Sequence, residues 1–356
     1  AQHRAQQHGR QAEHELQLLQ LPGALARGQC ALAVPGRLAF QAVGQVVVQP
    51  VVCRRPGQVH CVDDAVALEE ASGASGGPEG DVRVHINARD RAALTRFVDW
   101  VKRTQTHCLR ILFTPYGEAL IWPAYREALV ELSHLSHITQ VSIQTNASGP
   151  LSFLSDCDLR KVSLWISWHP TEIELSPFVE KIHALHAQGV QLSVGAVAIP
   201  IHLSQVEALR KRLPPHVPMW INAQKPGVSY SEAEQARWRA IDPDFDLELI
   251  RHRSQGKSCQ AGEHVLSIDG DGAITRCHFI DQKLGNLYQD DLATILRPRA
   301  CTRKTCECWI GYSHLVDLQL SQHFDPDRFL ARIRSTPSIP QRREGTSFSD
   351  GGNHQS

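Results

Sequence analysis

Short apolar runs alternate with amphipathic segments along the chain from residue 88 onwards. Leu94, Phe97, Val98 and Val101 follow the i, i+3, i+4, i+7 spacing of one helix face. Apolar runs then predict five strands, and helical patterns separate most of them. The strands are 109–113, 138–144, 161–167, 190–197 and 217–221, and the helices are 123–135, 177–189 and 204–213. This alternation is typical of parallel βαβ units. It predicts an α/β fold with an open sheet or partial barrel, because five strands are too few for a closed barrel of eight.

Polar residues follow the predicted strands at their carboxyl ends, where ligands bind in parallel α/β proteins. Gly117 and Glu118 follow the first strand, Asn146 follows the second, and Ser167 ends the third. The carboxyl ends of parallel strands meet at one rim, so these residues predict a ligand site there. Each also has a structural explanation, since Glu118 can cap the next helix and Asn146 can occupy a turn.

Five cysteines gather near the C-terminal end of the chain: Cys259, Cys277, Cys301, Cys306 and Cys308. The stretches "HVLSI" and "AITRC" flank "DGDG" and predict a hairpin, which would bring Cys277 toward Cys259. A calcium loop beginning at Asp269 is excluded because its twelfth position is Ile280. Four thiolates hold either zinc or an iron–sulfur cluster, and the spacing alone leaves both open.

The overall charge is balanced, with 37 Lys and Arg against 37 Asp and Glu, so it favours neither nucleic acid nor an anionic membrane as a partner. No run of 18 apolar residues and no signal-peptide pattern occurs. We therefore predict a cytoplasmic protein. In that compartment thiols stay reduced, and clustered cysteines serve metal binding or catalysis. The isolated Cys108 and Cys157 are predicted to be small core residues.

The composition changes near residue 85. The first 85 residues contain no Lys, Thr, Asn, Ile, Tyr, Trp or Met. We predict that 1–87 is an atypical leader, either disordered or non-native, in which "GQVVVQPVV" (44–52) could form a strand confined to a sheet edge by Pro50. The barrel is expected at 88–250, the cysteine-rich domain at 251–315, and a C-terminal helix with a disordered tail at 316–356.

Residues 88–315 resemble the radical SAM superfamily, specifically a bacterial subfamily with a SPASM or twitch-like auxiliary iron–sulfur domain. The stretch "FTPYGEAL" resembles the GGE-type element of that family, although Tyr116 replaces its first glycine. The spacing of Cys259, Gly272 and Cys277 fits the C-x9–15-G-x4-C opening of the auxiliary domain. The resemblance implies a partial (β/α)6 TIM-like barrel, here lacking its first strand, followed by a small cysteine-rich α+β domain.

The resemblance also implies roles for individual residues. Contacts to S-adenosylmethionine (SAM) would come from Gly117, Glu118, Asn146, Ser167 and Gly195. One auxiliary [4Fe–4S] cluster would be held by Cys259, Cys277 and two of Cys301, Cys306 and Cys308. Such an enzyme cleaves SAM reductively to a 5′-deoxyadenosyl radical, which abstracts hydrogen from a substrate. The substrate here is unknown, with a peptide as one candidate, and a flavodoxin or ferredoxin would donate the electron.

One defining motif of the family is missing. The C-x3-C-x2-C triplet that ligates the catalytic [4Fe–4S] cluster does not occur in this sequence, and no third cysteine completes a triplet with Cys53 and Cys61. Whether the chain is an enzyme therefore stays open. The alternatives to a radical SAM enzyme, or a truncated remnant of one, are a catalytically dead pseudoenzyme and a zinc-stabilised binding scaffold.

Overall fold

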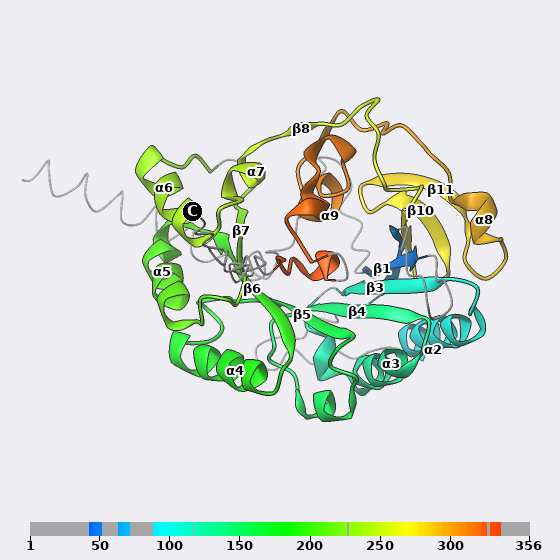
Figure 1. The fold of residues 1–356 in the computed structure, drawn as a ribbon, viewed down its shortest axis with the longest axis horizontal. Helices are drawn as coiled ribbons and strands as arrows, with labels where there is room; N and C mark the ends of the chain where they lie inside the picture. The colour runs from blue at the N-terminus through cyan, green and yellow to red at the C-terminus, as the bar shows by residue number, and fades with distance from the viewer. Residues whose placement is uncertain are drawn as a thin grey trace, which may run out of the picture.

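The protein has a mixed α/β fold in which a curled parallel sheet forms a half barrel (Figure 1). The computed structural model describes residues 43–51, 63–71, 88–115, 117–225, 228–325 and 328–335. The half barrel consists of β3 (Cys108–Thr114), β4 (Ile138–Thr145), β5 (Val162–Ser167), β6 (Gln191–Ala198) and β7 (Met219–Ala223). Neighbouring strands in this series pair in parallel. All five predicted strands are thus confirmed.

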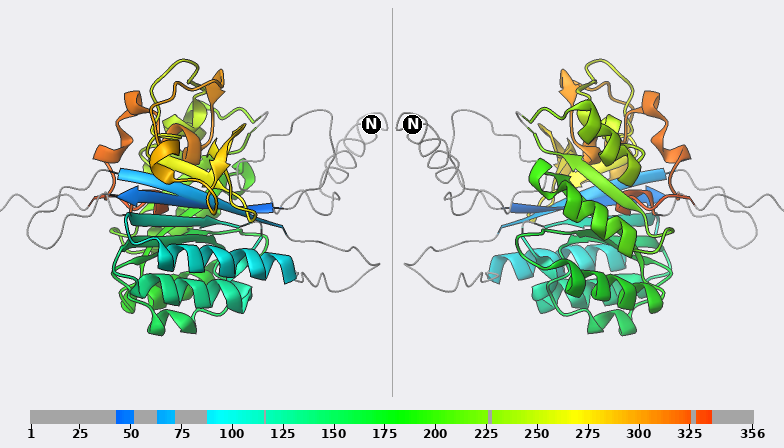
Figure 2. Two further views of the ribbon diagram at one scale, coloured as in Figure 1. Left: turned by 90° about the vertical axis from the view of Figure 1, so that its right-hand side faces the viewer. Right: turned by 90° about the vertical axis from the view of Figure 1, so that its left-hand side faces the viewer.

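Helices cover the convex side of the half barrel, as Figures 1 and 2 show. They are α2 (Ala88–Arg103), α3 (Pro123–His134), α4 (Leu175–Ala187), α5 (Leu203–Arg212) and α6 (Glu232–Ile241). The ring of Phe113 lies edge-on to Phe97 at 6.1 Å and to Tyr125 at 5.8 Å, so aromatic side chains join α2 and α3 to β3. No helix among the described residues is long and apolar enough to cross a membrane.

The C-terminal elements lie on the side of the half barrel away from its helices (Figure 2). They are α7 (Phe245–Leu249), β8 (His252–Arg253), β9 (Val265–Ile268), β10 (Ala273–Cys277), β11 (Ile280–Asn286), α8 (Leu292–Ile295), β12 (Thr305–Cys306) and α9 (Trp309–Tyr312). Three of them, β9 to β11, are strands that extend the sheet beyond the half barrel. The β9–β10 hairpin is as predicted. Its turn is closed by Asp269 Oδ1, which accepts hydrogen bonds from the backbone N–H groups of Asp271 and Ala273, and Gly272 supplies a φ of +81°.

Two strands lie inside the predicted leader: β1 (Val43–Val51) and β2 (Asp63–Ala71). Within the described residues they belong to one ten-strand sheet of order β11-β10-β9-β2-β1-β3-β4-β5-β6-β7. The expected edge position of β1 was wrong, because β1 pairs antiparallel with both β2 and β3 and Pro50 stands opposite Leu109. Proline removes only one N–H, and neighbouring pairs complete the register. The rest of 1–87 lies outside the described residues.

The expected C-terminal helix does not occur among the described residues from 316 to 335. Over 316–331 the chain forms three short 3-10 helices: η4 (Val316–Leu318), η5 (Leu320–Gln322) and η6 (Phe329–Ala331). Gln319 between the first two has a left-handed φ of +50°, which a continuous α-helix does not allow. The predicted disordered tail from 336 to 356 lies outside the described residues.

Candidate metal centre and adjoining concave face

Four free cysteines line one pocket among the C-terminal elements: Cys259, Cys277, Cys301 and Cys306. The hairpin brings Cys277 to Cys259, as predicted. Cys301 is held by its backbone N–H, which donates to the carbonyl of Lys257 at 3.1 Å. Cys306 is placed by the pairing of β12 with β8. Four of the five predicted ligands therefore converge from segments up to 47 residues apart, since 306 − 259 = 47.

Cys308, the fifth predicted ligand, is disulfide-bonded, and so is Cys108. A disulfide sulfur carries no thiolate and cannot ligate a metal in that state. This removes Cys308 from the ligand set in the structure. Cys108 is a buried core residue, as predicted, and the structure adds that it is disulfide-bonded. Cys157 is free and lies outside the pocket, in keeping with a structural role.

Burial makes three of the pocket thiols, those of Cys259, Cys277 and Cys306, weaker acids than a free cysteine. Burial raises the pKa of Cys277 to about 11 and that of Cys306 to about 12, and repulsion between the neighbouring thiols adds to the effect. Burial likewise raises the pKa of Cys259. These groups are therefore protonated at neutral pH, and a bound metal would have to displace their protons.

A buried cation stands beside the four thiols. Arg276 lines the pocket and is 1% exposed. Its guanidinium donates to the carbonyls of Ala261 at 2.8 Å and Arg299 at 2.5 Å, and also to the carbonyl of Ala300. Within the described part of the chain it pairs with no carboxylate. A buried charge is costly unless an opposite charge compensates it. An anionic centre built on four thiolates would supply that charge.

The four thiols line one pocket, and the two metal centres that four thiolates can hold place different demands on them. A zinc ion needs its four sulfurs at about 2.3 Å from one centre. Among the described residues, no three His, Cys, Asp or Glu side chains are grouped to hold a single metal ion. In a [4Fe–4S] cluster each thiolate bonds a different iron, so the ligands stand further apart. Four thiolates are a donor set that serves either metal centre, and only the zinc ion needs all four sulfurs around a single atom.

The concave face of the half barrel is polar although it is buried. Gln140 Nε2 donates to Ser163 Oγ at 2.6 Å, and Ser142 Oγ lies 2.7 Å from the same hydroxyl. Gln140 Oε1 is buried and has no hydrogen-bond partner. Parallel strands buried on both faces usually carry apolar residues. The strand assignment from sequence did not identify this row of buried polar side chains, although the alternation in "ITQVSIQT" contained the signal.

The predicted SAM-contacting residues at the first two strand ends hold each other. Glu118 caps η1 (Ala119–Ile121) by accepting from Leu120 N at 2.8 Å. Its carboxylate also accepts from Thr145 Oγ1 at 2.8 Å and from Asn146 N at 2.6 Å. Asn146 Oδ1 accepts from Ser148 N at 2.9 Å and so closes a turn. The structural explanations of Glu118 and Asn146 are confirmed, and Gly117 precedes them with a φ of +71°.

Ser167 and Gly195 stand opposite each other in the pairing of β5 with β6. A Cβ added to Gly195 would lie 2.0 Å from the indole of Trp220, so that ring occupies the space expected for adenine. The structure therefore brings together Gly117, Glu118 and Asn146, and separately Ser167 and Gly195. The carboxylate of Glu118, the amide of Asn146 and the space above Gly195 are all used within the chain, so these residues do not fit SAM as they stand.

We expect Gly195→Ala to destabilise the fold by about 1–3 kcal/mol, because the added methyl group overlaps the Trp220 ring. Chemical denaturation followed by circular dichroism measures this change. The double variant Gly195→Ala/Trp220→Leu should recover part of the loss by vacating the space. An unchanged unfolding midpoint in the single variant would contradict the close packing described here.

No family model matches this sequence, and no curated protein or solved structure matches it either.

Proposed function

We propose that this protein is an iron–sulfur protein of the radical SAM type that binds one auxiliary [4Fe–4S] cluster through Cys259, Cys277, Cys301 and Cys306. The observation that carries the proposal is the convergence of these four free thiols around one pocket. When bound, such a cluster stores and relays single electrons. The chain's own contribution is to ligate the cluster, to exclude water by burial, and to compensate negative charge through Arg276.

The radical SAM part of the proposal is supported by the half barrel and by the motif spacing around Cys259 and Cys277. A complete enzyme of this type has a partial (β/α)6 TIM-like barrel and a cysteine-rich domain. It would cleave SAM reductively and abstract hydrogen from a substrate, which is unknown here. The cysteine triplet is missing, and the carboxylate of Glu118 already accepts hydrogen bonds from within the chain. Both observations favour a remnant or pseudoenzyme. We propose that it keeps the auxiliary cluster and does not cleave SAM.

Anaerobic reconstitution tests the proposal. We expect the full chain to take up about four irons and about four acid-labile sulfides, as one [4Fe–4S] cluster requires. Metal analysis by mass spectrometry and a colorimetric sulfide assay measure both. The zinc scaffold is the competing outcome. Uptake of one zinc ion in competition with iron, with no sulfide retained, would refute the cluster and favour that scaffold.

A further inference from the structure

The C-terminal segment 328–335, here called the arm, fills the concave face of the half barrel. Ser193 Oγ on β6 donates to the carbonyl of Ala331 at 2.6 Å, and η6 contacts β4 and β5. Phe329, Leu330 and Ile333 are buried in the same apolar cluster as Trp165 and Trp220 of the barrel. The arm thus lies where the polar strand residues described above would otherwise face a ligand.

Three tryptophans surround the guanidinium of Arg332. Its central carbon lies 4.2 Å from the ring centre of Trp309, 4.9 Å from that of Trp220 and 5.7 Å from that of Trp165. Cations within about 6 Å of aromatic faces are attracted by the ring quadrupole, and most strongly when the site is dry. Arg332 is 3% exposed, so this aromatic cage is a desolvated cation site.

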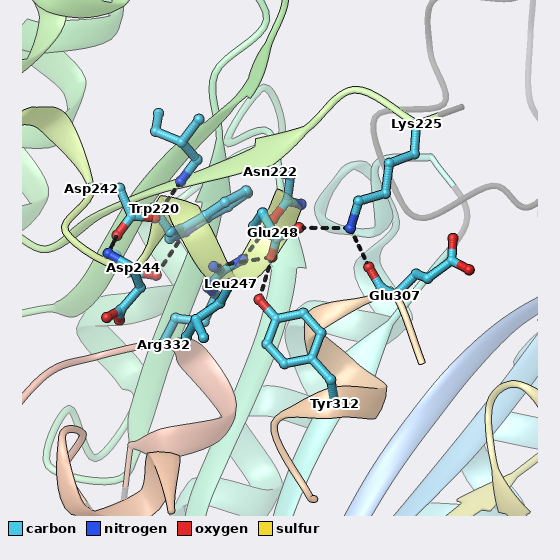
Figure 3. Close-up of polar contacts among 12 residues, drawn as sticks. Trp220, Asn222, Lys225, Asp242, Asp244, Leu247, Glu248, Glu307, Tyr312 and Arg332 are labelled. Carbon is cyan, nitrogen blue, oxygen red and sulfur yellow. Dashed lines mark hydrogen bonds and ion pairs between the residues drawn. The ribbon is translucent and has the colours of Figure 1, made fainter. Parts of the chain in front are cut away.

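Polar side chains of β7, α7 and α9 complete the cage around the guanidinium (Figure 3). Arg332 Nη1 donates to Asn222 Oδ1 on β7 at 2.7 Å, and Nη2 lies 3.6 Å from Glu248 Oε1 on α7. Glu248 is buried and is held in place by the hydroxyl of Tyr312, which donates to Oε1 at 2.6 Å. Lys225 Nζ lies 3.6 Å from the other carboxylate oxygen. The carboxylate is therefore fixed independently of the arm.

A second arginine of the arm occupies a second acidic subsite. Arg334 Nη2 lies 2.5 Å from Asp244 Oδ2 and 3.5 Å from Asp242 Oδ1. Asp242 is 1% exposed and is positioned by accepting from Ile221 N at 2.8 Å. Ile333 lies buried between the two arginines. The concave face thus holds an Arg-Ile-Arg sequence, with a separate carboxylate site for each guanidinium.

The backbone at Arg332 is strained. Its φ of +56° lies in the left-handed region, which residues with long side chains rarely occupy. Such strain persists only where surrounding contacts determine the conformation. Here the contacts of the guanidinium with the cage and Glu248 hold it. The contacts of the arginine side chain therefore outweigh the unfavourable backbone conformation at this position.

We propose that the aromatic cage and the two acidic subsites form a binding site for an Arg-x-Arg segment of a basic peptide, which the arm occupies as a pseudosubstrate. The groups that recognise the arginines lie outside the arm. They belong to β5, to β7, to the segment 242–248 and to α9, and the ring of Phe324 adds a contact 5.3 Å from the guanidinium of Arg334. The site lies at the carboxyl end of β7, the edge at which α/β proteins bind ligands. The inference does not depend on the cluster, so it goes beyond the function proposed above.

Because the arm occupies the site in its own chain, an added peptide binds more weakly. A ligand that binds only the open form shows an affinity reduced by the fraction of open chains, and a tethered segment competes at a high effective concentration. Loosening the arm should therefore tighten the binding of an added peptide. The same peptide should lose affinity when its arginines are removed.

The experiment uses the full chain and a fluorescein-labelled peptide of sequence Phe-Leu-Ala-Arg-Ile-Arg, which copies residues 329–334. Fluorescence anisotropy measures binding. We expect Arg332→Ala to bind at least about tenfold more tightly than the wild-type chain, and Arg334→Ala to bind more tightly by a smaller factor. Arg328→Ala is the matched control, because Arg328 pairs with Asp325 outside the acidic subsites. It should bind like the wild-type chain.

Two further measurements make the test decisive. A peptide with alanine in place of both arginines should not bind, and Glu248→Gln in the Arg334→Ala background should abolish binding. If Arg332→Ala does not fold, Arg334→Ala decides alone, since the Arg334 side chain is 31% exposed and its loss is tolerable. The proposal is overturned if no folded arm variant binds more tightly than Arg328→Ala, or if the alanine peptide binds equally well. Iron content is measured in parallel. If the peptide does not bind, the cluster proposal is unaffected, and if no cluster forms, the peptide-binding proposal is unaffected.

Discussion

Cys277→Ala should reduce the iron of the reconstituted protein from about four atoms per chain to less than about one. Cys277 lies at the end of β10, where its thiol enters the same pocket as Cys259 and Cys306. Alanine has no group that can replace a thiolate ligand. With only three protein ligands, the cluster would dissociate from the protein more readily. Iron analysis after desalting measures the effect.

Two other cysteines provide matched controls. Cys157→Ala should keep the full iron content, because Cys157 is free but lies outside the pocket. Cys308→Ala should also keep it, because Cys308 is disulfide-bonded rather than available as a ligand. Retention of all iron by Cys277→Ala, or its loss in Cys308→Ala, would show that a different set of cysteines binds the cluster.

The reconstituted chain, reduced with dithionite and given SAM, should form no 5′-deoxyadenosine above a no-protein control. The proposed auxiliary cluster would use all four pocket thiols, and the sequence contains no C-x3-C-x2-C triplet for a second cluster. The carboxylate of Glu118 already accepts hydrogen bonds from Leu120, Thr145 and Asn146. SAM would therefore meet no group that fixes its orientation for reaction. Liquid chromatography of the quenched mixture measures the product.

The contrary result would be equally specific. Product formation by the wild-type chain that is lost in Glu118→Ala would show that the strand-end residues do bind SAM and that an additional cluster forms elsewhere in the chain. A complete radical SAM enzyme assayed under the same conditions is the positive control. Without its activity, an absence of product would reflect the reductant rather than the protein.

The sequence by itself determined the local elements of this protein. Apolar periodicity located β3 to β7 and the helices between them, because burial of one helix face or of a whole strand needs only residues a few positions apart. The hairpin that carries Cys277 was visible for the same reason, since "DGDG" supplies both the side-chain caps and the left-handed glycine of its turn. Local structure then brought Cys277 toward Cys259.

Only the tertiary structure decided which groups remain free to act. Glu118 has the right residue type for a ligand contact, but Thr145 and Asn146 at the next strand end engage its carboxylate. The same holds for Cys308, which no spacing distinguished from Cys306. Most distant of all is the arm: Ser193 bonds to the carbonyl of Ala331, 138 residues away. Periodicity and capping act over a few residues, whereas these contacts depend on how the whole chain packs, and no local pattern encodes that packing.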